Sequence, residues 1–493
     1  MKLKVKDIGL ESGGPLVAVL NKEDAVKYDL HASDRILVRC NNKNVNAIID
    51  VSDTNKTVKP GQIGLFEETL RELHCKNNHL VDIRLSNPIE SVNYIKKKLQ
   101  GKRLNKKEII NIIKDIINNN LSEVELTYFV SACYTYGLNL DEIIYLTKAI
   151  IQNGESLKLN KKIILDKHSI GGVPGNRTTM IVVPIIASLG YTIPKTSSRA
   201  ISSATGTSDT MEVLANVSFP VSKIKSIIKK TNGCMVWGGG FNLASADDHL
   251  IRVRYPLSLD PRGMMIASIM AKKAAVNTTH LVIDFPIGNE AKIKSMKEAL
   301  SLKREFYNIG KRLGIKIKVL ITDGSQPVGN GIGPALEARD VLAVLKNNGP
   351  SDLRNKSIKL ATALLEMINV KDAGKKVIDS LESGLAYKKM IEIIKEQNGN
   401  PNIKIKDIRL GDYTRSIKSW KSGKVYSLSN KIFAKLARIA GAPNDKGAGV
   451  YLNIHINNNV KKNDVLFTIY SESKNKLDYV LDFLKENNPV IIK

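Results

Sequence analysis

The spacing of apolar and polar residues changes along the chain and divides it into regions. In the first region, alternating runs at residues 16–20, 35–40, 46–51 and 81–85 predict strands. Two short stretches near residues 22–28 and 61–74 have helical spacing. These elements indicate a small β-rich domain over residues 1–86.

After residue 88 the apolar residues recur every three or four positions. This period predicts helices at residues 89–99, 106–117, 122–136 and 140–152. Ser122 and Glu125 have the spacing of a capping box at the start of the third helix. We expect a helical domain over residues 87–160, with a helical insertion at 246–279.

A third pattern begins at residue 161, where a short apolar run stops at Asp166. A polar and glycine-rich loop follows as far as Gly175, and helical spacing resumes over residues 177–189. Strands at 280–285 and 315–322 continue this region, which predicts an α/β domain over residues 161–245 and 280–413.

The last region, residues 414–493, reads as strands at 425–428, 450–456 and 465–470 with helices at 430–439 and 474–485. A turn is expected at Lys446-Gly447-Ala448-Gly449. We therefore expect a multidomain protein of the α+β and α/β classes. Its parts are an N-terminal β-rich domain, a helical domain, a central mixed α/β sheet domain and a C-terminal α/β cap.

Two polar loops in the third region suggest an anion-binding site. The first contains Lys167 and several glycines, and the second, residues 196–209, contains eight hydroxyl residues and one arginine. Glycine lets backbone N–H groups approach an anion, and the N-terminus of the next helix attracts negative charge. The spacings of an ATP P-loop and of a Rossmann dinucleotide motif are both absent. A pair of ordinary turns is the alternative.

Composition narrows the choice of partners. The formal net charge of +27 favours anionic partners, but only 5% of residues are aromatic and the lysines are scattered. We therefore expect small anionic substrates, with no nucleic acid and no membrane as partners. The chain has no apolar signal segment and no run of about 18 apolar residues, which predicts a cytoplasmic protein.

The four cysteines, Cys40, Cys75, Cys133 and Cys234, are widely spaced and form no C-x-x-C pair. This distribution predicts reduced cysteines without a disulfide framework. His74, Cys75 and His79 lie close in sequence but have no fourth ligand at a suitable spacing. We interpret them as solvated loop residues and expect no metal site.

The sequence Asp166-Lys167-His168-Ser169-Ile170-Gly171-Gly172-Val173 resembles the signature D-K-H-S-x-G-G-V of the thymidine and pyrimidine-nucleoside phosphorylase family. The resemblance extends from about residue 88 to the C-terminus and implies a thymidine phosphorylase-like fold. Two stretches, 174–177 and 203–209, differ from the pyrimidine enzymes, and the N-terminal β unit is additional. These features resemble the archaeal AMP phosphorylase branch.

The resemblance implies a reaction in which AMP and phosphate give adenine and ribose 1,5-bisphosphate, with CMP and UMP as further substrates. In such archaea the product feeds an isomerase and a type III RuBisCO. No cofactor is implied, and a homodimer or a larger homo-oligomer is expected. The alternative within the fold is phosphorolysis of thymidine or uridine.

The resemblance also implies site residues. The phosphate-binding positions correspond to Lys167, Ser169, Thr178 and Thr207. The AMP-binding positions correspond to Gly172, Ser198, Arg199, Ala200, Ile201, Ser202, Ser203, Thr207, Ser268 and Lys292. Asp260 matches the proposed proton donor, with His168 as the rival acid.

Two of these assignments carry physical expectations. A carboxylic acid can protonate a purine only if its pKa is raised, so Asp260 is expected in a partly desolvated pocket. A guanidinium binds phosphate through two nitrogens, so Arg199, together with Arg177, is expected to bind the 5′-phosphate.

Two alternatives from other classes remain. The first is a non-enzymatic nucleic-acid binder, which only the positive charge favours. Phosphoribosyl transfer would need a Mg²⁺-binding acidic cluster, for which Asp247 and Asp248 are a poor candidate compared with a helix N-terminus stabilised by acidic residues.

Overall fold

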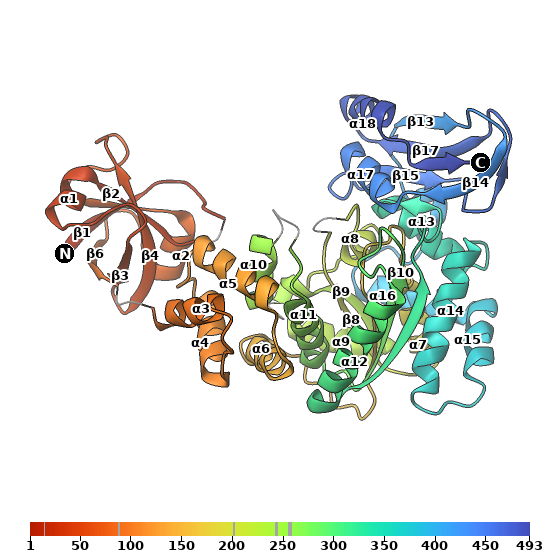
Figure 1. The fold of residues 1–493 in the computed structure, drawn as a ribbon, viewed down its shortest axis with the longest axis horizontal. Helices are drawn as coiled ribbons and strands as arrows, with labels where there is room; N and C mark the ends of the chain where they lie inside the picture. The colour runs from red at the N-terminus through yellow and green to blue at the C-terminus, as the bar shows by residue number, and fades with distance from the viewer. Residues whose placement is uncertain (14, 87–88, 201–202, 242–244, 255–258) are drawn as a thin grey trace. The chain divides into compact units, whose positions relative to one another are not determined.

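We describe a computed structural model of residues 1–493, in which all residues are described except 14, 87–88, 201–202, 242–244 and 255–258. The chain forms two compact units (Figure 1). Unit 1 comprises Met1–Asn153 with Ser245–Ala267, and unit 2 comprises Gly154–Ala244 with Ser268–Lys493. Among the residues described, no helix is both long and apolar enough to cross a membrane.

Unit 1 begins with a closed β-barrel in the strand order β1-β5-β2-β4-β3-β6 (Figure 1). Alternating side chains fill its interior, and Leu20, Ile36, Ile49 and Ile63 are fully buried. The strands are β1 (Lys2–Asp7), β2 (Val17–Asn21), β3 (Arg35–Cys40), β4 (Lys43–Ser52), β5 (Gln62–Leu65) and β6 (Leu80–Leu85), with helices α1 (Lys22–Lys27) and α2 (Glu67–Leu73).

The four predicted strands of this domain are present, but β1 and β5 were not predicted. The helix expected at residues 61–74 is wrong in its first part, because residues 62–65 form β5. This short strand pairs in parallel with β1 and antiparallel with β2. Ile63 and Leu65 are buried by those pairings, so barrel closure determines the conformation of a segment whose local pattern is ambiguous.

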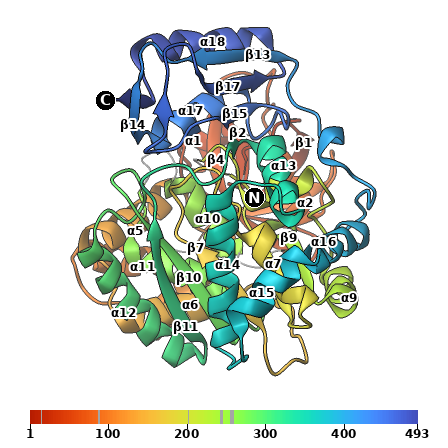
Figure 2. The same cartoon turned by 90° about the vertical axis from the view of Figure 1, so that its right-hand side faces the viewer.

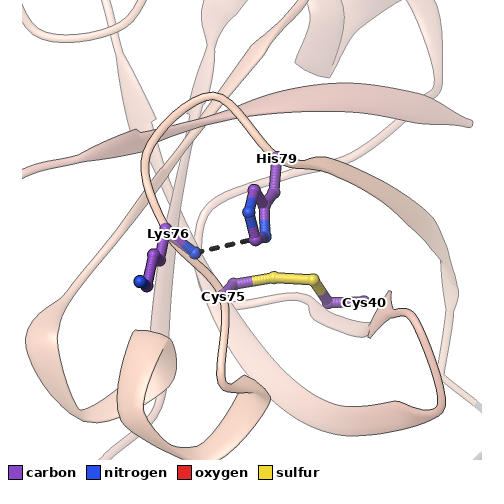
Figure 3. The surroundings of a disulfide bond; sticks show 4 residues. All are labelled: Cys40, Cys75, Lys76 and His79. Atoms are coloured by element: carbon purple, nitrogen blue, oxygen red, sulfur yellow. Dashed lines mark hydrogen bonds between the residues drawn. A yellow bond between two sulfur atoms is a disulfide. The ribbon is translucent and has the colours of Figure 1, made fainter.

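The expectation of reduced cysteines is also wrong in this barrel, because Cys40 and Cys75 form a disulfide (Figure 3). Cys40 ends β3 and Cys75 follows α2, so the fold brings together residues 35 apart in sequence. Cys75 is buried rather than solvated, while His79 is exposed beside the pair. The spacing of these two cysteines in the sequence does not indicate a disulfide, because disulfide connectivity depends on the fold.

The helices of unit 1 are α3 (Glu90–Leu99), α4 (Lys106–Ile117), α5 (Glu123–Tyr136), α6 (Leu140–Gln152) and α10 (Ser245–Arg254). Each predicted helix between residues 89 and 152 is present. The capping box at the start of α5 is confirmed, because Ser122 and Glu125 each bond the backbone of the other. Buried isoleucines of α4 and α6 form much of the bundle core.

Unit 2 is built on parallel strands. Three of them have the order β11-β10-β7 (Figure 2), and β8 pairs with β9. The strands are β7 (Leu165–Ser169), β8 (Ile193–Ser197), β9 (Gly233–Trp237), β10 (His280–Ile287) and β11 (Lys316–Asp323). The helices and helical turns are α7 (Thr179–Ser188), α8 (Thr207–Glu212), α9 (Val221–Thr231), η1 (Gly238–Phe241), α12 (Met296–Leu313), α13 (Pro334–Leu345), α14 (Ser351–Glu366), α15 (Ala373–Glu382), α16 (Leu385–Glu396) and η2 (Ile405–Asp407); α11 (Arg262–Ala275) begins in unit 1.

The helices cover the sheet and bury its centre. Helix α12 packs against β10 and β11, whereas α14 packs against β7 and β10 (Figure 2). Helix α7 is apolar on all sides and fully buried, so it lies inside the domain with its N-terminus at the end of the loop after β7. This placement puts the positive end of the helix dipole beside that loop.

The C-terminal part of unit 2 has two antiparallel sheets, in the orders β12-β15-β17-β13 and β16-β14-β18. Its elements are β12 (Gly331–Ile332), β13 (Tyr413–Lys418), β14 (Gly423–Leu428), α17 (Asn430–Ala440), β15 (Gly449–Leu452), β16 (Asn459–Val460), β17 (Val465–Ser471), α18 (Lys474–Glu486) and β18 (Val490–Ile492). Phe433 and Phe467 pack edge to face in its core, with ring centroids 5.2 Å apart.

Candidate functional site

The loop between β7 and α7 can form only because two of its residues are glycine. Gly172 has φ +93°, and a Cβ there would lie 2.7 Å from the backbone nitrogen of Lys292. Gly175 has φ +71° and packs directly against the carbonyl of Val328. Any larger residue would push these segments apart. The loop therefore brings Gly172 and Lys292 together, as two predicted AMP-binding positions should be.

Three predicted phosphate-binding residues, Lys167, Ser169 and Thr178, form one cluster. The Lys167 ammonium donates to Thr178 Oγ1 at 2.7 Å. Asn176 connects this pair to Ser169, because its Nδ2 donates to Ser169 Oγ at 3.1 Å and its Oδ1 accepts from Thr178 Oγ1 at 3.3 Å. The cluster thus combines a cation, hydroxyls and an amide beside the N-terminus of α7, which suits an anion.

A buried carboxylate, Asp284, supports this cluster from β10. Its Oδ2 accepts from Ser169 Oγ at 2.7 Å, and its Oδ1 accepts from Thr322 Oγ1 at 2.5 Å. The Lys356 ammonium lies 3.1 Å from the same Oδ2. Asp284 is fully buried, and because Lys356 and Lys167 offset the effect of burial, its pKa stays below the ordinary value.

Burial has the opposite consequence for Lys167. It lowers the pKa of the ammonium to about 7; Asp284 opposes this shift, and Lys356 and Arg177 add to it. A lysine with this pKa is partly neutral at neutral pH, and a nearby anion would stabilise its charged form. The cluster is therefore a place where negative charge would be stabilised.

The second polar loop is held against the first by Arg177. Its guanidinium donates to the carbonyl of Thr205 at 2.7 Å and to Thr207 Oγ1 at 3.3 Å, and it pairs with Glu337. Thr207 begins α8, where Asp209 accepts from the backbone of Gly206 at 2.8 Å. Thr207, the fourth predicted phosphate-binding residue, is thus tied to the first loop.

Arg199 is engaged by a carboxylate. Its two terminal nitrogens bond Glu212 at 2.7 and 2.6 Å, and its guanidinium lies 4.9 Å from the centre of the Trp237 ring. Lys446, in the turn expected at residues 446–449, bonds Glu212 at 2.8 Å. The hydrogen bond from Arg199 lowers the pKa of Glu212 to about 2, so this network stays charged at neutral pH.

The remaining residues of this loop are described only in part. Asp209 accepts from the backbone of Ala200 at 2.7 Å, and Ser208 donates its backbone N–H to the carbonyl of Ser198 at 3.4 Å. Ser203 Oγ donates to the carbonyl of Thr205 at 3.1 Å. Ile201 and Ser202 lie outside the described residues.

A second buried carboxylate, Asp166, lies below the site. It pairs with Lys273 at 2.6 Å and with Lys195 at 3.4 Å, and Lys195 also donates to the carbonyl of Lys167 at 2.6 Å. Burial, together with these lysines and Lys167, lowers the pKa of His168 well below its ordinary value. His168 is therefore neutral at pH 7, which weakens it as the rival acid.

The partly desolvated pocket expected for Asp260 stays a prediction, and unit 1 gives the surroundings of its side chain. Its side chain is 36% exposed, and its carboxylate lies 3.4 Å from the Arg254 guanidinium. The intervening residues 255–258 lie outside the described part of the chain. Ser268 is buried on α11.

Of the acidic pair considered for Mg²⁺, Asp247 pairs with Arg254 at 3.6 Å, and the side chain of Asp248 lies outside the described part of the chain. Among the described residues, the one group of three side chains close enough to share a metal ion is Cys40, Cys75 and His79.

Sequence reasoning missed several residues of the site. Asp284 could have been found, because it lies near the carboxyl end of a strand that was predicted. Lys356 could not, because it is one of two lysines on an ordinary amphipathic helix. Glu212 and Glu337 were equally hidden, since only the fold brings them to Arg199 and Arg177.

Comparison with known families agrees with this architecture. The helical bundle domain of the glycosyl transferase family matches residues 92–154, and the α/β domain of that family matches residues 161–387. The pyrimidine nucleoside phosphorylase C-terminal domain matches residues 424–490.

A solved structure shares part of the fold. Anthranilate phosphoribosyltransferase from Thermus thermophilus aligns with a TM-score of 0.52 at 17% identity, covering 62% of this chain and 99% of that one. At this identity the likeness concerns the fold alone.

Two relatives match over the full length of the chain. AMP phosphorylase from Pyrococcus furiosus is 45% identical, covering 100% of this chain and 98% of the relative. AMP phosphorylase from Thermofilum pendens is 44% identical, covering 100% of this chain and 95% of the relative. Since full-length identity at this level accompanies all three domain matches, the chain belongs to the AMP phosphorylase family.

Proposed function

We propose that the protein catalyses the phosphorolysis of AMP. An oxygen of inorganic phosphate attacks C1′ of the ribose, the bond from C1′ to N9 breaks, and adenine leaves with a proton. The second product is ribose 1,5-bisphosphate. The observation that carries this proposal is the cluster of Lys167, Ser169 and Thr178 beside the N-terminus of α7, in a chain whose full-length relatives are named AMP phosphorylases.

The cluster suits the first requirement of the reaction, which is a phosphate held in a fixed position. Lys167 supplies charge, and the hydroxyls of Ser169, Thr178 and Thr207 supply directed donors. Their partners, Asp284, Asn176 and Arg177, fix these side chains before the substrate binds. Such preorganisation lowers the entropic cost of bringing phosphate to the sugar.

The second requirement is a proton for the departing base. Asp260 is the donor in this proposal, and its carboxyl must be protonated when adenine leaves. In this proposal His168 does not donate the proton, because its lowered pKa keeps it neutral, and it orients the loop after β7 instead.

Product analysis tests the proposed reaction. The purified chain is mixed with phosphate and AMP, adenosine or thymidine, and sulfate replaces phosphate in a control. We expect phosphate-dependent release of adenine from AMP and far less base from either nucleoside. Base release from thymidine but not from AMP would place the chain with the nucleoside phosphorylases, and CMP and UMP test the range of bases.

Recognition of the 5′-phosphate is assigned in this proposal to Arg199. The guanidinium is 36% exposed and already bound to Glu212, so a phosphate must compete with that carboxylate. Arg199→Ala should raise the KM for AMP at least tenfold while leaving the KM for adenosine within about threefold, because about 1.4 kcal/mol of phosphate binding is lost. Equal changes for both substrates would rule Arg199 out, and Glu212→Gln, which frees the guanidinium, should lower the KM for AMP.

The setting of the reaction is also proposed. AMP and phosphate are metabolites of the cell interior, so we place the protein in the cytoplasm. The expected homodimer or larger assembly, and the supply of ribose 1,5-bisphosphate to a type III RuBisCO pathway, belong to the same proposal.

A further inference from the structure

Lys356 is a buried cation of the site to which no ligand has been assigned above. It lies on α14, and only 9% of its side chain is exposed. Its ammonium nitrogen is inaccessible and has no hydrogen-bond partner among the described residues. Its one ion pair within that part of the chain is with Asp284 Oδ2, at 3.1 Å. Burying an ammonium group with so few acceptors costs free energy. A bound ligand that supplies a further acceptor would offset this cost.

The geometry directs this cation to the phosphate cluster. The Asp284 oxygen that faces Lys356 also accepts from Ser169 Oγ at 2.7 Å and lies 3.4 Å from Asn176 Nδ2. Lys356 is also close enough to Lys167 to lower the pKa of that ammonium. Lys356 and Lys167 therefore approach the same group of donors from two different elements, α14 and β7.

Among the described residues, the cations of this group outnumber the carboxylates. Arg177 is paired with Glu337, and Asp166, which also acts on Lys167, already pairs with Lys195 and Lys273. Lys167 and Lys356 therefore share the carboxylate of Asp284. A site with surplus buried positive charge favours an anion, and a phosphate dianion would accept hydrogen bonds from both ammonium groups.

We propose that Lys356 is a further phosphate-binding residue, which completes the anion site formed by Lys167, Ser169 and Thr178. This inference rests on the proposed function in one respect, namely that inorganic phosphate is the anion. It adds a residue from α14 to a site otherwise formed by the strand ends and the two polar loops.

Calorimetric titration of the full chain with inorganic phosphate, in the absence of AMP, tests the proposal directly. Lys356→Met should weaken phosphate binding at least tenfold and raise the KM for phosphate by a similar factor, with a smaller change in kcat. Lys359→Met is the matched control, because Lys359 lies on the same helix but is exposed, and it should stay within twofold of the wild type. Phosphate binding by Lys356→Met within twofold of the wild type would overturn the proposal.

A structural role for Lys356, in which it only neutralises Asp284, makes a different prediction. In that case Lys356→Met should have no further effect once Asp284 is changed to Asn. We expect instead that the double variant binds phosphate at least fivefold more weakly than Asp284→Asn alone. Equal affinities in this pair would overturn direct binding, and Lys356→Arg, which keeps the charge, should retain more affinity than Lys356→Met.

The outcomes separate this inference from the proposed function. If the wild type binds phosphate through Lys356 but releases no adenine from AMP, the proposed reaction fails and the phosphate site stands. If adenine is released normally by Lys356→Met at low phosphate concentration, the reaction stands and the role of Lys356 is wrong.

Discussion

Asp166 and Asp284 are fully buried carboxylates on the neighbouring strands β7 and β10, and each faces lysine side chains. Their positions along the strands differ, because Leu281 is the residue opposite Asp166 and Ser169 is the residue opposite Asp284. Asp284 therefore lies three residues nearer the carboxyl end of the sheet, where loops and the N-terminus of α7 meet.

This difference in position separates a structural network from a functional one. Asp166 pairs with Lys195 and Lys273, and both ammonium groups have hydrogen-bond acceptors, so this network is complete without a ligand. Asp284 instead holds Ser169, Thr322 and Lys356, with Asn176 at longer range. Buried carboxylates and lysines thus stabilise the domain around Asp166, and three residues nearer the carboxyl end of the sheet they form an anion site.

The largest expected effect is on catalysis. Lys167→Met should lower kcat/KM for phosphate about a thousandfold, because one charged donor to the reacting anion is lost. Steady-state kinetics at varied phosphate concentration measure this, and circular dichroism confirms that the variant is folded. If the variant instead loses stability and keeps its activity, the distinction between the two networks fails.

The next effect is on stability. Asp166→Asn leaves Lys195 and Lys273 buried without a carboxylate, so the free energy of unfolding should fall by about 3 kcal/mol. Urea denaturation measures this change. The control is Lys318→Met, which breaks an exposed ion pair with Glu366 and should cost less than about 1 kcal/mol. Similar values for the two variants would contradict a structural role for Asp166.

The smallest effect is a pH dependence of anion binding. Burial lowers the pKa of Lys167 to about 7, so the ammonium that attracts the anion is present below this pH and is lost as the pH rises above it. The inhibition constant of sulfate should therefore rise with pH, approaching about tenfold per unit well above 7. Sulfate remains a dianion over this pH range, so any change in its inhibition constant reports titration of the protein. An inhibition constant that does not change from pH 6 to 9 would contradict the prediction.

Local pattern was sufficient for much of the fold. The capping box at Ser122 and the helix expected at residues 177–189 follow from residue type and spacing over a few positions. The strand before that helix was expected to stop at Asp166, but β7 runs from Leu165 to Ser169, because pairing with β10 holds these polar residues in the sheet. Strand β5 was missed, because four residues next to a helix carry too little pattern of their own. The disulfide between Cys40 and Cys75 was missed because it depends on barrel closure.

The site divides in the same way. Lys167, Ser169 and Thr178 lie within twelve residues, so one sequence stretch was enough to suggest an anion site, and short-range geometry brings them together. Arg199 was expected to bind phosphate, but it is paired with Glu212, which also bonds Lys446 from a distant part of the chain. The sequence could not indicate this competition.

By itself, the sequence determined where the helical region and most of the strands lie, because those signals depend on neighbours along the chain. Only the tertiary structure decided which charged side chains meet. Asp284 and Lys356 are 72 residues apart, yet their side chains meet at 3.1 Å where β10 and α14 pack. Buried electrostatics depends on distance in space and on exclusion of water, and neither can be read from the order of residues.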